Sequence, residues 1–397
     1  MKTPLRVVVV YHYYAHYRAA LLRSLSIFPG IDFNLVSGME TEAPSLEIIA
    51  PVGMKSNENS MCGCNWRRVR NIWLGGRFLW QIGILKAMRD LNPEVVITLG
   101  AVHYPASWLL LFYCKVRRLP IVFWTHGLYG SESWLVRKLR LIFYRMADHV
   151  MTYGEYSRLL LLEGGLAGDR VTAIHNSLDC ERQRECASNV ERIDRAVLCA
   201  RFRVNPESKV VLFVGRLTRQ KQLDLLIEAF AIVCRRREGH GEVQLLIVGD
   251  GPKRNELERL SVTRGICEYV RFLGAVHDET VLAGIFRISD VCVSPGEIGL
   301  TAIHSLGYGV PVVTHGNLTE QMPEVEAIDD GVTGSFFKQG DVNDLAFEID
   351  RWIDIEPEAV EICRARCRAV VEEKWSPHFQ ARAIANICKS TVLKGAK

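Results

Sequence analysis

The sequence has no long apolar run. The longest apolar helix candidate, Ala106–Cys114, ends at Lys115 and falls far short of the ~20 residues that span a bilayer. Near the start, the apolar residues Val7–Val10 give way to Tyr11, and so short a run cannot form the ~7–15-residue apolar region of a secretion signal. We therefore expect a cytoplasmic chain, soluble or held on the inner face of the cytoplasmic membrane.

Two kinds of cofactor signature are also missing. No Gly-x-Gly-x-x-Gly turn follows a strand, which argues against a hydride-transfer cofactor, and nothing favours nucleic-acid binding. The close cysteine pairs, Cys62 with Cys64 and Cys363 with Cys367, lack a second pair at zinc-site spacing, so we expect no metal site. Twelve scattered cysteines, mostly within apolar segments, are typical of free thiols in a reducing compartment.

Charge is unevenly distributed along the chain. Residues 1–180 contain 20 Lys and Arg against 13 Asp and Glu, a balance of +7; the totals of 49 and 45 leave 29 against 32, or −3, for the remainder. A basic first half indicates an anionic partner, such as a phospholipid surface or a phosphate-bearing acceptor.

Strand and helix patterns alternate in both halves, which predicts α/β domains with parallel sheets covered on both faces. We expect a first domain over 1–180, a charged linker over 181–208 and a second domain over 209–376, with a last helix at about 377–397 packing back on the first. Strands are predicted at Arg6–Val10, Phe33–Val36, Val95–Leu99, Ile121–Thr125, His149–Thr152, Val171–Ile174, Val210–Val214, Gln244–Val248, Tyr269–Phe272, Val291–Val293 and Pro311–Thr314. Helices are predicted at Phe78–Asp90, Ala106–Val116, Trp134–Met146 and Pro377 to about Val392.

The second half opens with a buried strand, a glycine turn at Gly215, and cations at Arg216 and Lys221 near a helix start. At the carboxyl end of a parallel strand these groups face the crevice where ligands bind. An Arg fork with a Lys point charge suits a diphosphate. A solvated loop of basic residues is the alternative.

Six further segments follow in a recognisable order. They are Leu225–Phe230, Leu246–Pro252, Val270–Gly274, Ser289–Pro295, Gly309–Val313 and Asp330–Gly334. Together with Phe213–Leu217 and Lys221, this series resembles the donor domain of the retaining family 4 glycosyltransferases. The resemblance implies the GT-B fold, with two facing Rossmann-like domains and an interdomain cleft.

The resemblance also implies a function. A nucleotide-diphosphate sugar would be the donor, and Gly215, Arg216 and Lys221 would hold its pyrophosphate and stabilise the leaving nucleoside diphosphate. The sugar would pass with retention to a hydroxyl of a glycan or lipid-linked acceptor, in bacterial surface polysaccharide synthesis on family grounds. No Asp-x-Asp motif occurs, so we expect neither an obligatory metal nor a separate cofactor.

One part of the family pattern is altered. Alignment on Gly309–Val313 puts Gly296 and His304 where the family carries two glutamates, with Glu297 one place out of register. The turn Gly299-Leu300-Thr301 remains, and its backbone amides can bind phosphate or sugar oxygens. His304 could replace the ribose-binding glutamate, pack as an ordinary helix residue, or mark an inactive protein that binds only a nucleotide or a partner.

The first half carries the acceptor candidates. His126 ends a strand before Gly127, and in the family a histidine at this location contacts the donor sugar near the reacting carbon. The loop after the first strand has no glycine, so its side chains must provide contacts, with His16 and Arg18 as candidates for the acceptor. An aromatic start to a packed helix is the alternative for this loop.

Two segments interleave cations with aromatic residues, Trp66–Trp80 and Trp134–Arg145. Such segments can lie in an anionic lipid interface, where each cation contributes on the order of 1 kcal/mol. Amphipathic helices with a solvated face are the alternative.

Overall fold

A computed structural model describes residues 3–41, 48–49, 60–238 and 242–395. The chain divides into two compact units, Met1–Asp179 with Ser376–Lys397, and Cys180–Trp375. In the described part of the chain, no helix is both long and apolar enough to cross a membrane.

The first unit is built on a sheet with the strand order β10-β9-β8-β7-β1-β2-β4-β3. Its strands are β1 (Leu5–Val10), β2 (Ile31–Ser37), β3 (Ser60–Met61), β4 (Cys64–Arg68), β7 (Val95–Leu99), β8 (Ile121–Thr125), β9 (His149–Thr152) and β10 (Val171–Ala173). All neighbours pair in parallel except β3 and β4. The valines of the central strand β1, Val7–Val10, are all buried because parallel sheets are covered on both faces.

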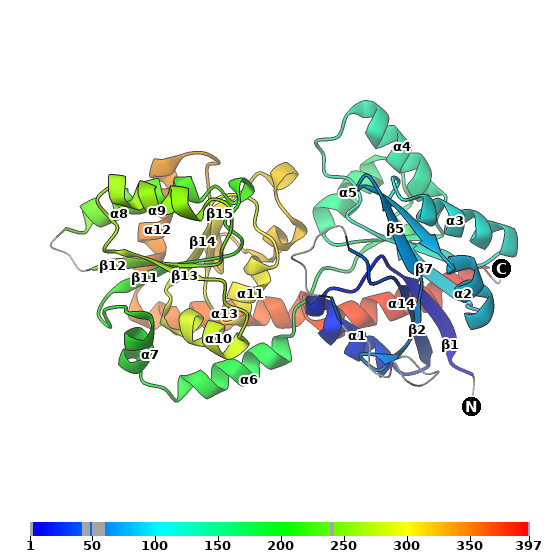
Figure 1. Cartoon of the computed structure of the whole chain (residues 1–397), viewed down its shortest axis with the longest axis horizontal. Helices are drawn as coiled ribbons and strands as arrows, with labels where there is room; N and C mark the ends of the chain where they lie inside the picture. The colour runs from blue at the N-terminus through cyan, green and yellow to red at the C-terminus, as the bar shows by residue number, and fades with distance from the viewer. Residues whose placement is uncertain (1–2, 42–47, 50–59, 239–241, 396–397) are drawn as a thin grey trace. The chain divides into compact units, whose positions relative to one another are not determined.

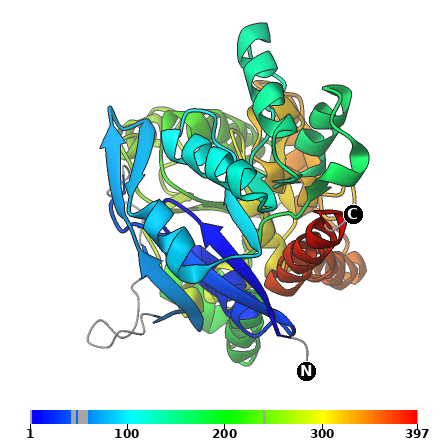
Figure 2. The ribbon, with the colours of Figure 1, turned by 90° about the vertical axis from the view of Figure 1, so that its right-hand side faces the viewer.

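Helices cover the two faces of this sheet. They are α1 (Ala19–Ser26), α2 (Ile84–Leu91), α3 (Pro105–Arg117), α4 (Trp134–Arg145), α5 (Glu155–Glu163) and α14 (Pro377–Gly395). Val7 and Val9 pack with α1 and α14, whereas Val8 and Val10 pack with α2 and α3. The ribbon of α14 accordingly lies on the face of the sheet opposite to α2 and α3 (Figure 2). The C-terminal helix thus belongs to the first unit; positions 396 and 397 lie outside the described residues.

A two-stranded antiparallel ribbon, β5 (Arg70–Leu74) with β6 (Phe78–Ile82), corrects one prediction. The sequence suggested a helix over Phe78–Asp90, but only Ile84–Leu91 is helical. Side chains of β6 alternate between exposed and buried, which is the period of a strand. Gly83, with φ +93°, then redirects the chain into α2.

The second unit holds a six-stranded parallel sheet in the order β13-β12-β11-β14-β15-β16. Its strands are β11 (Lys209–Val214), β12 (Val243–Val248), β13 (Val270–Gly274), β14 (Val291–Ser294), β15 (Val312–His315) and β16 (Gly334–Phe337), the last of which the sequence did not suggest. Its helices are α6 (Cys180–Glu191), α7 (Arg195–Phe202), α8 (Leu223–Arg236), α9 (Arg254–Thr263), α10 (Glu279–Ile288), α11 (Thr301–Gly307), α12 (Val342–Ile353) and α13 (Pro357–Lys374). Within this unit, α8, α9 and α12 lie on one face of the sheet and α10, α11 and α13 on the other (Figure 1).

The predicted linker over 181–208 is wrong. Most of it forms α6 and α7, which pack on α10 and belong to the second unit. The buried residues of α6 recur at helical spacing, at Cys180, Gln183, Cys186 and Val190. The dense charge that suggested a linker lies on the solvent face of these helices, and Asp194 caps α7 by accepting from the Ala196 amide.

The two sheets confirm the expected α/β class with two parallel-sheet, Rossmann-like units.

Candidate functional site

In the second unit, the loop after β11 lies against the loop after β12. The Gly215 amide donates to the Val248 carbonyl at 2.9 Å, and the Leu217 amide donates to the Asp250 carbonyl at 3.0 Å. A Cβ atom added at Gly249 would lie 1.8 Å from the Gly215 carbonyl oxygen. Glycine is therefore required for this close approach, which sets Arg216 at the carboxyl end of the sheet.

Lys221 joins the β11 loop to the loop after β14. Its Nζ donates to the Glu297 carbonyl oxygen at 2.5 Å, and the Gly296 amide donates back to the Lys221 carbonyl at 3.1 Å. Burial lowers the pKa of Lys221, against the opposing effect of the Glu297 and Glu324 carboxylates. The structure thus gathers Lys221 and Glu297, two of the predicted donor residues, at one point of the sheet edge.

The backbone explains why a glutamate is missing at position 296. A Cβ atom added at Gly296 would lie 2.0 Å from the Gln220 carbonyl oxygen, so this loop has no room for a side chain there. The Glu297 amide donates to the same carbonyl at 3.1 Å. Glu297 therefore occupies the neighbouring position as part of a consistent loop conformation.

The Gly299–Thr301 turn precedes and opens α11. The Thr301 hydroxyl donates to the Val214 carbonyl at 3.1 Å, and the Ile298 amide donates to the Gln321 side chain at 2.7 Å. In the described part of the chain, the amides of Gly299, Leu300 and Thr301 donate to no protein group. Such amides at a helix start can bind anionic or hydroxyl oxygens.

His304 contacts a carboxylate that the sequence analysis did not select. Its Nε2 lies 2.9 Å from Oε1 of Glu279, which also accepts from the Tyr308 hydroxyl at 2.7 Å. Burial raises the pKa of Glu279, but hydrogen bonds from His304 and Tyr308 outweigh it and leave the pKa below its usual value. The carboxylate is therefore ionised at neutral pH, so Nε2 carries the proton that it donates.

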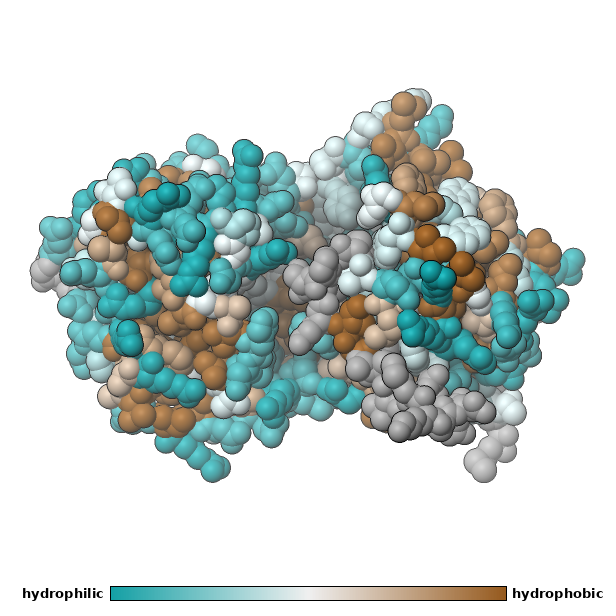
Figure 3. Space-filling model, in the orientation of Figure 1, coloured by the Kyte–Doolittle hydropathy of each residue, from teal (hydrophilic) through white to brown (hydrophobic). Residues whose placement is uncertain are grey.

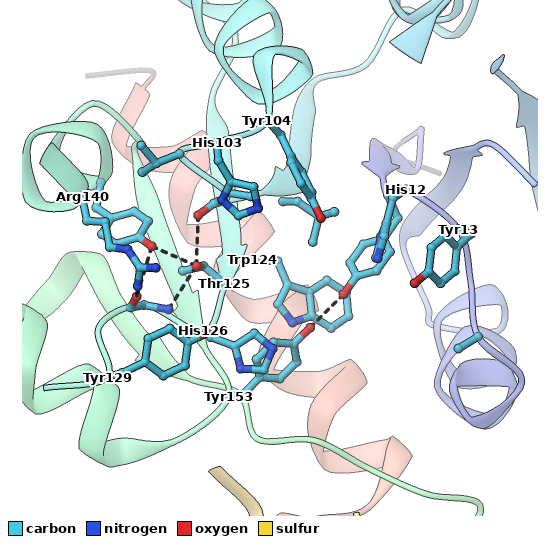
Figure 4. A pocket seen from close by; sticks show the side chains of 18 of the residues that line it. His12, Tyr13, His103, Tyr104, Trp124, Thr125, His126, Tyr129, Arg140 and Tyr153 are labelled. Carbon is cyan, nitrogen blue, oxygen red and sulfur yellow. Dashed lines mark hydrogen bonds between the residues drawn. The ribbon is translucent and has the colours of Figure 1, made fainter. Parts of the chain in front are cut away.

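The first unit contains a pocket of about 360 Å³ at the carboxyl ends of β1, β7, β8 and β9 (Figure 4). We call it the first-unit pocket. Its walls are Tyr11, His12, Tyr13, Ala15, Tyr17, Arg18, Leu99–Tyr104, Trp124–Gly127, Tyr129, Arg140, Tyr144 and Tyr153. This edge of a parallel sheet is where ligands are expected.

Arg18 is the most enclosed cation of the pocket. Only 6% of it is exposed, and Nη2 donates to the hydroxyls of Tyr11 and Tyr153 at 3.0 and 2.7 Å. The guanidinium carbon lies 5.0 Å from the ring centres of both Tyr11 and Trp124. No carboxylate among the described residues pairs with it.

His126 also lines the pocket, as the strand-end position predicted. Its carbonyl accepts from the Ser157 hydroxyl at 2.6 Å, and its ring packs on Tyr153 with centroids 4.5 Å apart. Burial lowers the pKa of His126 to about 4, assisted by Arg18 and Arg140. The ring is therefore neutral at physiological pH.

The structure separates the two acceptor candidates. Arg18 lines the pocket, whereas His16 is exposed and does not. Sequence reasoning missed His12, Tyr104, Trp124 and Tyr153, which also face the pocket. The position of Trp124 two residues before His126 at the same strand end was a usable signal; nothing marked the others.

Two parallel-sheet, Rossmann-like units are the architecture of the GT-B glycosyltransferases. Residues 208–354 match the family model of glycosyl transferases group 1, and residues 55–182 match that of glycosyltransferase family 4. These matches indicate that the chain is a glycosyltransferase of the GT-B fold.

Known proteins resemble the chain over different lengths. Alpha-D-kanosaminyltransferase of Streptomyces kanamyceticus is 24% identical over 339 residues, covering 79% of this chain and 82% of that protein. The GDP-mannose-dependent alpha-(1-6)-phosphatidylinositol dimannoside mannosyltransferase of Mycobacterium tuberculosis is 32% identical over 139 residues, covering only 34% of each protein.

Among solved structures, Anabaena HepE in complex with UDP and glucose has a TM-score of 0.65 and 16% identity, covering 97% of this chain and 100% of that one. At this identity the likeness shows the fold alone.

Proposed function

We propose that the protein transfers a sugar from a nucleoside diphosphate donor to a hydroxyl of a glycan or lipid-linked acceptor, with retention at the anomeric carbon. The observation that carries the proposal is the placement of Gly215 and Arg216 directly after β11, on the loop in which Lys221 contacts Glu297 at the carboxyl edge of the second sheet. A diphosphate needs several donors and about two compensating charges there. One relative is named for its dependence on GDP-mannose, which is the class of donor proposed.

In this proposal the two cations stabilise the negative charge that forms in the transition state. Arg216 and Lys221 stabilise the charge that develops on the departing phosphate, and the amides of Gly299, Leu300 and Thr301 bind oxygens of the donor. The departing phosphate helps to deprotonate the acceptor hydroxyl on the same face of the sugar. No step requires a metal ion, because the two side chains already balance the diphosphate charge.

His304 and Glu297 complete the donor contacts. Because Nε2 of His304 donates to Glu279, Nδ1 is the nitrogen that accepts from a ribose hydroxyl. Glu279 thus acts as a positioning residue, holding one tautomer of the imidazole. Glu297 lies beside Lys221 and contacts the transferred sugar.

The first-unit pocket takes the acceptor in this scheme. Neutral His126 hydrogen-bonds the donor sugar near its reacting carbon, and Arg18 contacts the acceptor from within the pocket. His16, exposed two residues before Arg18, contacts acceptor groups outside it.

A second candidate function is nucleotide or partner binding without transfer. Two observations favour it: Gly296 has no room for the family's first glutamate, and Nε2 of His304 is committed to Glu279. A panel of UDP-, GDP-, ADP- and dTDP-sugars separates the candidates. A bound donor at about 100 times its Kd stabilises the fold by about 2.7 kcal/mol, so the melting temperature identifies it, and release of nucleoside diphosphate then distinguishes an enzyme from a binder.

Association with an anionic membrane is part of the proposal for lipid-linked acceptors and surface polysaccharide synthesis. Apolar residues gather over α4 (Figure 3), where Trp134, Leu135 and Leu139 are 68, 69 and 48% exposed. Lys138 lies on the same helix, 5.1 Å from the Trp134 ring. An exposed apolar face with cations beside it suits the boundary between headgroups and acyl chains. The other basic-aromatic segment, Trp66–Trp80, forms strands, and Trp66 is buried.

A further inference from the structure

We propose that the first-unit pocket binds a negatively charged oxygen group, a carboxylate or a phosphate, on the terminal sugar of the acceptor, with Arg18 as its charge partner. The assignment of this sugar to the acceptor rests on the proposed function. The anion site itself follows from the residues of the pocket.

The first argument is an uncompensated buried charge. Arg18 is 6% exposed, and among the described residues its hydrogen bonds go to the neutral hydroxyls of Tyr11 and Tyr153. Burying a charge without a counter-ion is costly. Folding tolerates this cost most readily when a ligand supplies the missing negative charge.

None of the neighbouring groups can supply that charge. Burial raises the pKa of Tyr11 and also that of Tyr153, so both phenols stay neutral at physiological pH. The other arginine of the pocket, Arg140, is different because it donates to Glu132 at 3.0 Å. The pocket therefore has one balanced cation and one unbalanced cation.

The second argument is a set of buried polar atoms without partners. Of the nine such side-chain atoms in the described part of the chain, four belong to this pocket: Nη1 of Arg18, Nε1 of Trp124, Nδ1 of His12 and Nδ1 of His126. All four residues line the same pocket. Trp124 is 2% exposed. Because buried polar atoms in proteins are nearly always satisfied, this concentration points to an absent partner.

The chemistry of these atoms selects the partner. Guanidinium and indole N–H groups can only donate, so a ligand must present acceptor oxygens to Arg18 and Trp124. The histidines are neutral, with the pKa lowered by burial to about 3 for His12 and about 4 for His126, and each can donate through the proton its tautomer carries. A carboxylate or phosphate provides the several lone pairs that these donors require.

The size and walls of the pocket suit one sugar unit. Its volume of about 360 Å³ is at the lower end of the ~300–1,000 Å³ of small-molecule sites. Trp124, His126, Tyr129 and Tyr153 surround the space with rings (Figure 4). Flat apolar rings beside polar atoms suit the faces and hydroxyls of a sugar. An acidic sugar or a sugar phosphate fits both features.

Saturation-transfer NMR on the full chain tests the proposal with three matched probes. Glucose is the neutral reference, glucuronate adds a carboxylate, and glucose 6-phosphate adds a phosphate at the same carbon. We expect binding of one or both charged sugars, with glucose at least about tenfold weaker because it lacks the charge-assisted hydrogen bonds. The stronger charged probe identifies the anion. Equal binding of all three, or of none, would overturn the proposal.

Variants locate the binding site. Arg18→Met and Trp124→Phe should each weaken binding of the charged sugar, whereas Arg216→Met in the second unit should leave it unchanged. The reverse pattern would place the anion in the donor site and contradict the proposal. These measurements need no donor, so failure of every nucleotide sugar to bind would remove the proposed function and leave the anion site standing.

A stability measurement separates a ligand site from a structural role. Because Tyr11 and Tyr153 also hydrogen-bond each other at 2.9 Å, Arg18→Met leaves both hydroxyls paired and removes an unbalanced charge. We expect a melting temperature equal to or above that of the wild type. A clear fall in melting temperature with charged-sugar binding unchanged would show that Arg18 is structural and overturn the proposal.

Discussion

Lys221 donates from its ammonium to the Glu297 carbonyl oxygen at 2.5 Å, and this contact links two loops at the edge of the second sheet. The same ammonium can also donate a hydrogen bond to a phosphate of the nucleotide sugar, since an ammonium has three N–H donors. The loop contact therefore positions Lys221 before any ligand binds. Such preorganisation reduces the cost of ordering the site when a ligand arrives.

Replacing either donor cation should impair the enzyme. For Arg216→Met and Lys221→Met, we expect a fall in turnover of about 10²–10³-fold, because each removes a charge aimed at the departing phosphate. Steady-state kinetics with the donor found in the nucleotide-sugar panel checks this. Arg219→Met, a substitution of an exposed cation in the same loop, is the matched control and should leave turnover within about twofold.

The His304–Glu279 pair should affect donor binding as a unit. His304→Ala removes the proposed ribose contact, and Glu279→Gln can reverse the ring tautomer, so both should raise the donor Kd, by about tenfold for a lost hydrogen bond to a buried group. Tyr308→Phe keeps the His304–Glu279 bond and serves as the control. Unchanged donor affinity by calorimetry for His304→Ala would assign that residue to packing alone.

The free energy of unfolding should fall in acid, because two histidines of the first-unit pocket become protonated. His126 is partly accessible to solvent, but its ring is enclosed by the walls of the pocket. Burial lowers the pKa of His126 to about 4 and the pKa of His12 to about 3. The unfolded chain takes up these protons near pH 6.5. The stability that their neutral forms contribute is thus complete above about pH 6.5 and is lost as the pH falls toward 4 and below.

Urea unfolding between pH 4 and 7 measures this dependence. His126→Phe should reduce the slope of unfolding free energy against pH, since one group whose proton uptake differs between the two states is removed. A slope identical to that of the wild type would show that His126 has no lowered pKa.

The exposed face of α4 should bind anionic vesicles. Leu135→Ser and Leu139→Ser together should reduce flotation with vesicles containing phosphatidylserine, because they remove apolar surface that the acyl region would bury. Val262→Ser, at an apolar position 63% exposed in the second unit, is the matched control. Flotation that is equally weak with neutral and anionic vesicles would exclude this surface as a lipid contact.

Sequence patterns identified most of the strands because buried parallel strands are continuous apolar runs. Val95–Leu99, Ile121–Thr125 and His149–Thr152 agree with the structure residue for residue. Errors arose where the pattern was ambiguous. The alternating burial of Phe78–Ile82 can be recognised only when the pairing with β5 is known. The charges of residues 181–208 concealed two amphipathic helices.

The two candidate sites differed in how far the sequence could describe them. The donor loop is local, so Gly215, Arg216 and Lys221 stand together in the chain. The surroundings of Arg18 come from Tyr11, Trp124 and Tyr153, whose separation along the chain conceals their contact. Glu279 lies 25 positions from His304 and carries no motif. Such partners are set by the fold and not by sequence spacing.

The central claim is sugar transfer from a nucleoside diphosphate with retention at the anomeric carbon. NMR of the anomeric proton, recorded while the donor from the panel is turned over, tests it most directly. We predict that the first product formed, by transfer or by slow hydrolysis, has the anomeric configuration of the donor, and that Arg216→Met slows its formation by about 10²–10³-fold. A product of inverted configuration, or a tightly bound donor that is never consumed, would contradict the claim.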